Sequence, residues 1–316
     1  MSASASTLRR DRAAAGVQPR GAGVRRRRRR TPAWWFLAPY LVLLLAFGIV
    51  PAVYGLYEAF VVSSVVGPSS FSLTQNFVDV LGDYRLPGAV THVLLYLLAW
   101  MPLLLIVVFV VALVLDSKRT RMASLTRFIA YVPGAVTGSA AALLWLFMFS
   151  PSVSPVGGFL GLFASKNGSF LSDRTFPIVL AVMGIAAGAG GWIVVLYGAL
   201  TAIPQEVLES ASLDGANAWQ TAWHIKLPLI RSYIAFILIV SVAQGFQVFV
   251  EPTVIAGGAP GQVSQTWSIN QLVYSYASQD SNYGRASALA MLLLLVCIGL
   301  AVLIIKKTNF YSIGDR

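Results

Sequence analysis

The sequence has very few of the residues from which most enzyme sites are built. Its 316 residues include one cysteine, Cys297, and two histidines, His92 and His224, and only 11% of the residues are charged. A single cysteine excludes a disulfide framework and a thiolate metal site within the chain. Neither histidine has a carboxylate at a spacing that suggests a catalytic pair. The sequence therefore predicts no catalytic residue and no metal site.

The motif that holds the phosphates of ATP is also missing. A P-loop requires G-x-x-x-x-G-K-[ST], and no Gly-Lys pair occurs in the chain. The hydrolase motifs G-x-S-x-G and H-E-x-x-H are absent as well. We therefore expect this chain to bind no cofactor, and any work done by ATP and Mg²⁺ would take place on a separate partner.

Apolar residues are what the sequence has in excess. They make up 57% of the chain, and the mean hydropathy is +0.73, far from the composition of a soluble globular domain. Several apolar runs reach the roughly 20 residues that a helix needs to cross a bilayer. We predict an all-α, polytopic membrane protein whose six transmembrane helices cover about residues 34–60, 90–115, 128–149, 177–203, 233–256 and 286–305. The segment Tyr131-Val132-Pro133 predicts a kink in the third of them.

The net charge of +11 is concentrated at the N-terminus, where the first 30 residues hold ten Arg. Residues 1–32 are predicted to be a basic, disordered cytoplasmic tail, and residues 33–316 the transmembrane domain. Nineteen of the 23 Lys and Arg fall on the side of this tail and four on the other. The bias places both termini and the loop 204–230 in the cytoplasm, and we expect the chain to lie in the plasma (inner) membrane. Nucleic-acid binding by the tail is the alternative, but an Arg run carries no base-reading geometry, so we expect no nucleic-acid partner.

The longest polar-rich passage between two apolar runs is residues 206–228, EVLESASLDGANAWQTAWHIKLP. Its start, residues 205–213, has no Gly or Pro and predicts a short helix after Pro204, with Glu206 in the first turn. Asp214-Gly215 is a turn dipeptide in which Gly can take a positive φ.

A second short helix is predicted to follow this turn. Asn217 is suited to be its N-cap, and the helix should end before Pro228. The loop 204–230, called the elbow below, is thus predicted to be a helix-turn-helix at the membrane surface. Its apolar residues are suited to a groove on a partner protein: Leu208, Ala211 and Leu213.

The elbow resembles a loop of a known family. Glu209-Ser210-Ala211, then Gly215, then Ile225-Lys226-Leu227-Pro228 are similar to the EAA loop of the membrane subunits of ABC importers, E-A-A, three residues, G, nine residues, I-x-L-P. Ser210 replaces the middle Ala. The resemblance implies a type I permease fold and a coupling helix that docks into an ATPase subunit; an ordinary polar loop is the alternative. The coupling residues that it implies are Glu206, Glu209, Ala211, Asp214, Gly215, Ile225, Leu227 and Pro228.

Polar residues inside the fifth span are candidates for solute contact, because such groups are costly in a bilayer. Gln244, Gln247 and Glu251 are spaced i, i+3 and i+7, which places them on one helical face. Amides and a carboxylate could hydrogen-bond the hydroxyls of a polar solute, and the rings of Phe249 and Trp145 could stack on a sugar. The alternatives are interhelical hydrogen bonds for the two Gln, a structural role for Glu251 and ordinary packing for Trp145.

A second resemblance covers residues 247–260, QVFVEPTVIAGGAP, which are similar to the end of the fifth span in sugar-type ABC permeases. There an apolar run ends in T-G-G-G-P, where this chain has Ala256 and Ala259 for the Thr and the third Gly. The likeness runs from about residue 34 to the C-terminus. It implies a subunit of the maltose-F or sugar-A kind, which forms half of the translocation pathway for a sugar or sugar-like solute; glycerol-phosphate and other polyol permeases share the pattern. It also implies a second permease subunit, two ABC ATPase subunits and an extracytoplasmic solute-binding protein.

Two other classes remain as alternatives. A secondary transporter or channel could use Glu251 within the membrane and would need no ATPase, so co-purification with a nucleotide-binding subunit would argue against it. An intramembrane enzyme is disfavoured because the spans lack a catalytic pair.

Overall fold

The computed structural model describes residues 34–63, 68–117, 121–136, 138–150, 154–155, 158 and 171–308. These residues are mostly helical, and two short strands, β1 (Val61–Val62) and β2 (Ser70–Phe71), pair antiparallel. The contacts divide the chain into two units, residues 1–51 and 52–316. The predicted basic tail, residues 1–32, lies outside the described residues.

The first predicted span is confirmed as a helix. It comprises α1 (Trp34–Leu44), the π-helical η1 (Leu45–Ile49) and α2 (Val50–Glu58). Residues Phe36–Glu58 are long and apolar enough to cross a membrane.

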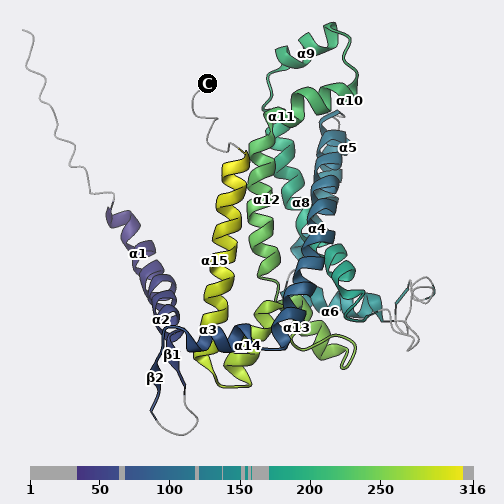
Figure 1. Cartoon of the computed structure of the whole chain (residues 1–316). Helices are drawn as coiled ribbons and strands as arrows, with labels where there is room; N and C mark the ends of the chain where they lie inside the picture. The colour runs from purple at the N-terminus through teal and green to yellow at the C-terminus, as the bar shows by residue number, and fades with distance from the viewer. Residues whose placement is uncertain are drawn as a thin grey trace, which may run out of the picture. The chain divides into compact units, whose positions relative to one another are not determined.

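Four further helical segments of the second unit are each long and apolar enough to cross a membrane, and their bounds lie within a few residues of predicted spans: Arg85–Ser117, Phe176–Thr201, Arg231–Gly258 and Tyr283–Thr308. α4 (Arg85–Ser117) packs along α8 (Phe176–Thr201), while α12 (Arg231–Phe246) contacts α4, α8 and α15 (Tyr283–Thr308) (Figure 1). The interior is apolar, and so are many residues on the outside, such as Leu98 and Leu294. Apolar residues on both faces of a helix are typical of a bundle surrounded by lipid.

The segment predicted to form one crossing over residues 128–149 is sharply bent in the structure. The chain forms α5 (Arg121–Tyr131), the 3₁₀ turn η2 (Val132–Ala135) and α6 (Gly138–Phe149), and the axis bends by 101° between residues 128–135 and 138–149. Pro133 lies in η2, and Gly138 has a φ of +64°. A proline has no N–H to donate, and the positive φ of Gly138 leaves the helical region, so the helix ends before Gly138 and α6 starts in a new direction. The kink predicted at Tyr131-Val132-Pro133 lies where the chain bends, and the bend of 101° is larger than expected of a kink.

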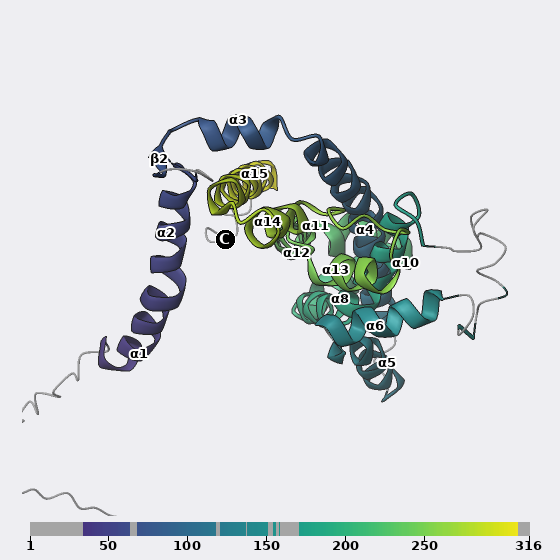
Figure 2. The same ribbon diagram turned by 90° about the horizontal axis from the view of Figure 1, so that it is seen from below.

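Short elements cover both ends of the bundle in the second unit. At one end are α9 (Gln205–Leu213), α10 (Ala218–Thr221), the π-helical η3 (Ala222–Lys226) and α11 (Leu227–Leu229), which together form the elbow. At the opposite end are α3 (Gln75–Leu81), α13 (Val250–Gly258) and α14 (Ile269–Ser278), which are seen in Figure 2. The elbow and these helices therefore lie on opposite sides of the apolar bundle.

Candidate functional site

The first arm of the elbow is the helix that the sequence predicts, and its bounds agree. α9 follows Pro204 and has Glu206 in its first turn. The turn after it is confirmed too: Gly215 has a φ of +80°, and its N–H donates to the Ser212 carbonyl at 3.1 Å. Only glycine takes this conformation without strain. Gly215 therefore sets the angle between α9 and the second arm of the elbow, which consists of α10, η3 and α11.

Asn217 is the N-cap of the second arm, as predicted. Its Oδ1 accepts from the Gln220 backbone N–H at 2.8 Å, and Gln220 Oε1 accepts from the Asn217 backbone N–H at 2.9 Å, which is a capping box. The prediction that this helix ends before Pro228 is wrong. Helical structure continues through η3 into α11 and ends at Leu229, because Pro228 lies in the first turn of α11, where a missing N–H is tolerated.

The predicted coupling residues differ in exposure. Five of them are exposed, namely Glu206, Glu209, Asp214, Gly215 and Pro228, and two are half-buried, namely Ile225 and Leu227. Ala211 is only 8% exposed, so its own chain covers the methyl group, whereas the neighbouring Leu213 is 89% exposed. The elbow therefore presents two carboxylates of α9 and the Leu213 side chain to its surroundings.

The second arm is attached to α4 by a buried ion pair that sequence reasoning missed. Lys226 Nζ lies 2.6 Å from Asp116 Oδ2, and the two side chains are 14% and 4% exposed. Trp223 of η3 meets Phe109 of α4 edge-on at 6.1 Å between ring centroids. Asp116 near the end of a long apolar run indicates that its carboxylate needs a partner. The sequence does not identify Lys226 as this partner, because 110 residues separate the two.

A cavity of about 330 Å³ lies where α4, α6 and α8 meet the junction of α12 and α13. All five residues that the sequence singles out for solute contact line it: Trp145, Gln244, Gln247, Phe249 and Glu251. The other walls come from α4 and α8 and were not predicted. They include Tyr96 and Trp100, whose rings are stacked 5.3 Å apart, and Gly184 and Gly188.

The reason given for grouping the polar residues was wrong, although they do come together. Gln244, Gln247 and Glu251 do not share one face of a continuous helix, because α12 ends at Phe246 and α13 begins at Val250. The Gln247 N–H donates to the carbonyls of Ala243 and Gln244, which closes the helix. Broken helices are tolerated at membrane depth where they line a cavity, and this break brings all three side chains to one.

The three polar side chains that line the cavity differ in exposure: Gln244 and Gln247 are exposed, and Glu251 is half-buried. Within the part of the chain that the structure describes, no hydrogen bond or ion pair is made by the side chains of Gln244, Gln247 or Glu251. Trp100 Nε1 is buried and has no acceptor among the described residues. A Cβ on Gly184 would lie 2.7 Å from that atom, so the absence of a side chain at 184 makes room for the indole ring.

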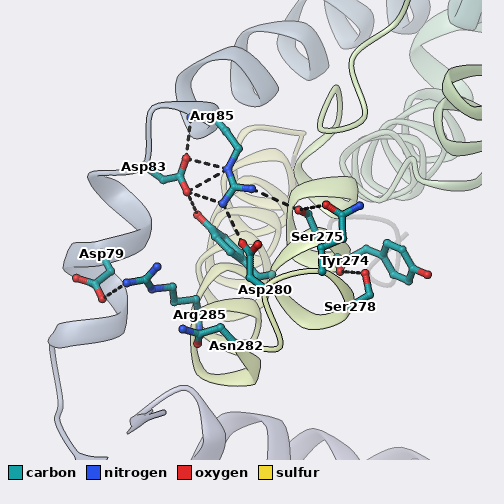
Figure 3. Close-up of polar contacts among 11 residues, drawn as sticks. Asp79, Asp83, Arg85, Tyr274, Ser275, Ser278, Asp280, Asn282 and Arg285 are labelled. Atoms are coloured by element: carbon teal, nitrogen blue, oxygen red, sulfur yellow. Dashed lines mark hydrogen bonds and ion pairs between the residues drawn. The ribbon is translucent and has the colours of Figure 1, made fainter. Parts of the chain in front are cut away.

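A polar cluster fastens the start of α4 to α14 at the end opposite the elbow (Figure 3). Arg85 Nη2 lies 2.9 Å from Asp83 Oδ2 and 3.2 Å from Asp280 Oδ2, and the guanidinium lies 5.0 Å from the centre of the Tyr276 ring. The Tyr276 hydroxyl donates to Asp83 Oδ2 at 2.7 Å. A second pair joins Arg285 of α15 to Asp79 of α3 at 2.8 Å.

Asp83 is the most perturbed acid of this cluster. Burial alone would raise the pKa of Asp83, but hydrogen bonds from Arg85 and Tyr276 outweigh it and lower the pKa from 3.8 to about 2. Burial and the bond to the Asp83 carboxylate raise the pKa of Tyr276. Asp83 is therefore ionised, and Tyr276 neutral, over the whole physiological range of pH.

Comparison with known proteins adds evidence that the geometry alone does not provide. A family model described as "Binding-protein-dependent transport system inner membrane component" matches residues 84–308, which is well over half of the 316 residues. The matched range contains the cavity and the elbow, and it begins one residue after Asp83.

Relatives of similar length support this match. The chain is 25% identical over 288 residues to the multiple sugar-binding transport system permease protein MsmF of Streptococcus mutans serotype c, covering 89% of this chain and 96% of that protein. It is 28% identical over 286 residues to the osmoprotective compounds uptake permease protein GgtC of Synechocystis sp., with coverages of 88% and 96%. It is 27% identical over 292 residues to the sn-glycerol-3-phosphate transport system permease protein UgpA of Brucella suis biovar 1, also with coverages of 88% and 96%.

A solved structure shares the fold. It is described as a bacterial alginate ABC transporter in complex with alginate pentasaccharide-bound periplasmic protein, and one of its chains matches with a TM-score of 0.72 at 21% identity, over 88% of this chain and 94% of that one. At this level of identity the likeness shows the fold, an all-α polytopic bundle.

Proposed function

Because this chain belongs to the family of binding-protein-dependent transport system inner membrane components, we propose that it forms half of the translocation pathway of an ATP-driven importer for a sugar or sugar-like solute. The family consists of transport components, so the chain is a multi-pass subunit of the inner membrane and not a catalyst. The observation that carries the proposal is the cavity, in which three polar side chains without partners among the described residues meet aromatic rings.

The chemistry of the lining suits a polyhydroxylated solute. Gln244 and Gln247 each offer an amide that can donate and accept, and Glu251 offers two acceptor oxygens. Trp145 and Phe249 add ring faces that can cover the apolar C–H surface of a sugar. Gln244 and Gln247 are exposed and Glu251 is half-buried, and none of them has a side-chain partner among the described residues. Polar groups at membrane depth usually face a cavity or a partner, and in a transport subunit that partner is the solute.

The names of the relatives point to the same class of solute without fixing the solute itself. One is described as binding multiple sugars, one as taking up osmoprotective compounds and one as carrying sn-glycerol 3-phosphate. The importer would have a second permease subunit, two ATPase subunits that hold ATP and Mg²⁺, and an extracytoplasmic solute-binding protein. Both termini and the elbow would face the cytoplasm.

Coupling would pass through the elbow. α9 presents Glu206, Glu209 and Leu213 for contact with an ATPase subunit. The second arm is bound to the end of α4 through Lys226 and Asp116, and the same helix lines the cavity about four turns further along. A movement of the elbow would therefore displace a wall of the solute site.

The experiment is uptake by proteoliposomes that contain the assembled importer, supplied with saturating solute-loaded binding protein. Gln244→Ala and Gln247→Ala should each reduce the uptake rate by about tenfold, since each removes one hydrogen bond of about 1.4 kcal/mol in the pathway. Gln75→Ala is the matched control, because Gln75 lies on α3 and bonds to Asp79 away from the cavity. Full uptake by both cavity variants, or uptake that continues without ATP, would contradict the proposal.

A further inference from the structure

The lining of the cavity carries charge of one sign. Among the described residues that form it, Glu251 is charged and none is Lys, Arg or His. The rest of the wall is apolar or aromatic, and includes Leu180, Met183 and Phe249. In such surroundings a charge acts over a longer range than in water.

Glu251 has no counter-ion in the part of the chain that the structure describes. The ion pairs found there join Arg85, Lys226 and Arg285 to carboxylates at the two ends of the bundle, and none reaches the cavity. Glu251 itself lies in the first turn of α13, and Phe249 provides no side-chain cap. A helix N-terminus favours a negative charge in its first turn, so α13 stabilises the carboxylate where a cationic partner is absent.

The same geometry is unfavourable for an anionic solute. Proteins recognise phosphates and carboxylates with Arg, Lys or free helix N-termini. The described lining has no such cation, and Glu251 already occupies the N-terminal turn of α13. An ionised carboxylate only accepts hydrogen bonds, so it can bind the hydroxyls of a neutral solute but repels an oxyanion.

On the basis of the function proposed above, we infer that the solute is an uncharged polyhydroxylated molecule and that Glu251 determines this specificity. Its carboxylate accepts hydrogen bonds from solute hydroxyls and excludes phosphorylated or carboxylated analogues. The two glutamines and the aromatic rings contribute affinity, which both kinds of solute share, whereas the charge of Glu251 contributes the discrimination between them.

The test is equilibrium binding to the purified complex of permease and ATPase subunits, without the binding protein, so that the selectivity of the binding protein does not intervene. Paired probes are glycerol with sn-glycerol 3-phosphate, glucose with glucose 6-phosphate, and trehalose with trehalose 6-phosphate. For the pair whose neutral member binds, we expect the wild type to prefer that member by at least about tenfold. Glu251→Gln keeps the shape and removes the charge, and it should reduce this preference at least fivefold. Glu58→Gln, an acid outside the cavity, should leave the preference unchanged.

The outcomes separate this inference from the function on which it rests. If the wild type binds both members of a pair equally, or if Glu251→Gln leaves the preference unchanged, the inference is overturned while the cavity remains the solute site. If no probe binds to the wild type, the inference of a neutral polyhydroxylated solute is overturned. If the Gln244 and Gln247 variants also retain full uptake, the cavity is not the solute site and both proposals are overturned.

Discussion

The ion pair between Asp116 and Lys226 supports a quantitative prediction about stability. The two side chains are 4% and 14% exposed and lie 2.6 Å apart. Removing one partner of a buried pair leaves an uncompensated charge and typically costs about 3–5 kcal/mol, whereas replacing both with apolar residues of similar size is often neutral. Asp116 makes a further interaction besides the one with Lys226. We therefore expect Lys226→Met to cost about 3 kcal/mol and Asp116→Leu about 5 kcal/mol.

The measurement is the free energy of unfolding in detergent micelles, with the melting temperature as a second readout. A loss of 3 kcal/mol corresponds to a fall in Tm of roughly 6–12 °C for a chain of this size. The double variant Asp116→Leu/Lys226→Met should recover most of the loss, which gives a coupling energy of several kcal/mol in the double-mutant cycle. Lys307→Met is the matched control, since Lys307 is exposed on α15, and it should cost less than about 0.5 kcal/mol. Single variants that lose under about 1 kcal/mol, or strictly additive losses, would refute the reasoning.

Three further predictions concern the turn, the helix packing and the effect of pH. The variants Gly215→Pro and Gly215→Asn should both fold into the membrane. Gly215→Pro should abolish uptake, because proline cannot adopt the φ of +80°. Gly215→Asn should retain most of the uptake, because asparagine tolerates a positive φ. Gly190→Ala lowers the Tm because its Cβ would overlap the Ala130 backbone, while Gly191→Ala meets nothing within 4 Å and serves as the control. In the folded protein the pKa of Asp83 is about 2, below the ordinary 3.8. The contribution of Asp83 to stability is therefore complete above about pH 4 and is lost as the pH falls through about 2. The difference in Tm between the wild type and Asp83→Asn should be constant from pH 7 to about pH 4 and should then shrink.

Each of these predictions has an outcome that contradicts it. Normal uptake by Gly215→Pro would show that the angle of the elbow does not matter for transport. Equal melting temperatures for the two glycine variants would show that α8 is not packed against α5 as described. A difference in Tm for Asp83→Asn that persists unchanged at pH 2 would mean that the carboxylate is not the source of the stabilisation.

Local features of the elbow could be predicted from the sequence because short-range signals determine them. Pro204 and the Asp214-Gly215 turn define the ends of α9, and the capping box at Asn217 uses residues three apart. The long apolar helices could be predicted as well, since their length against the bilayer is sufficient evidence.

The features that depend on tertiary packing could not be predicted. Pro133 indicates where the bend between η2 and α6 lies but not how large it is, because the run is apolar on both sides and hydropathy does not reveal a change of direction. The break at residues 247–249 contains neither Gly nor Pro, and only the cavity that it lines explains it. Asp116 and Lys226 are 110 residues apart, and Trp100 reaches the cavity from a different helix than Gln244.

The two glycines in the wall of the cavity differ in a way that bears on how this protein could change. A methyl group at Gly184 would strike the Trp100 ring, whereas one at Gly188 meets nothing within 4 Å. At residue 188, side chains of increasing size can therefore narrow the cavity without disturbing the contacts between the helices. Substitutions at this one position could change the preference of a related protein from large to small solutes, while its stability and its contacts with the ATPase subunits stay the same.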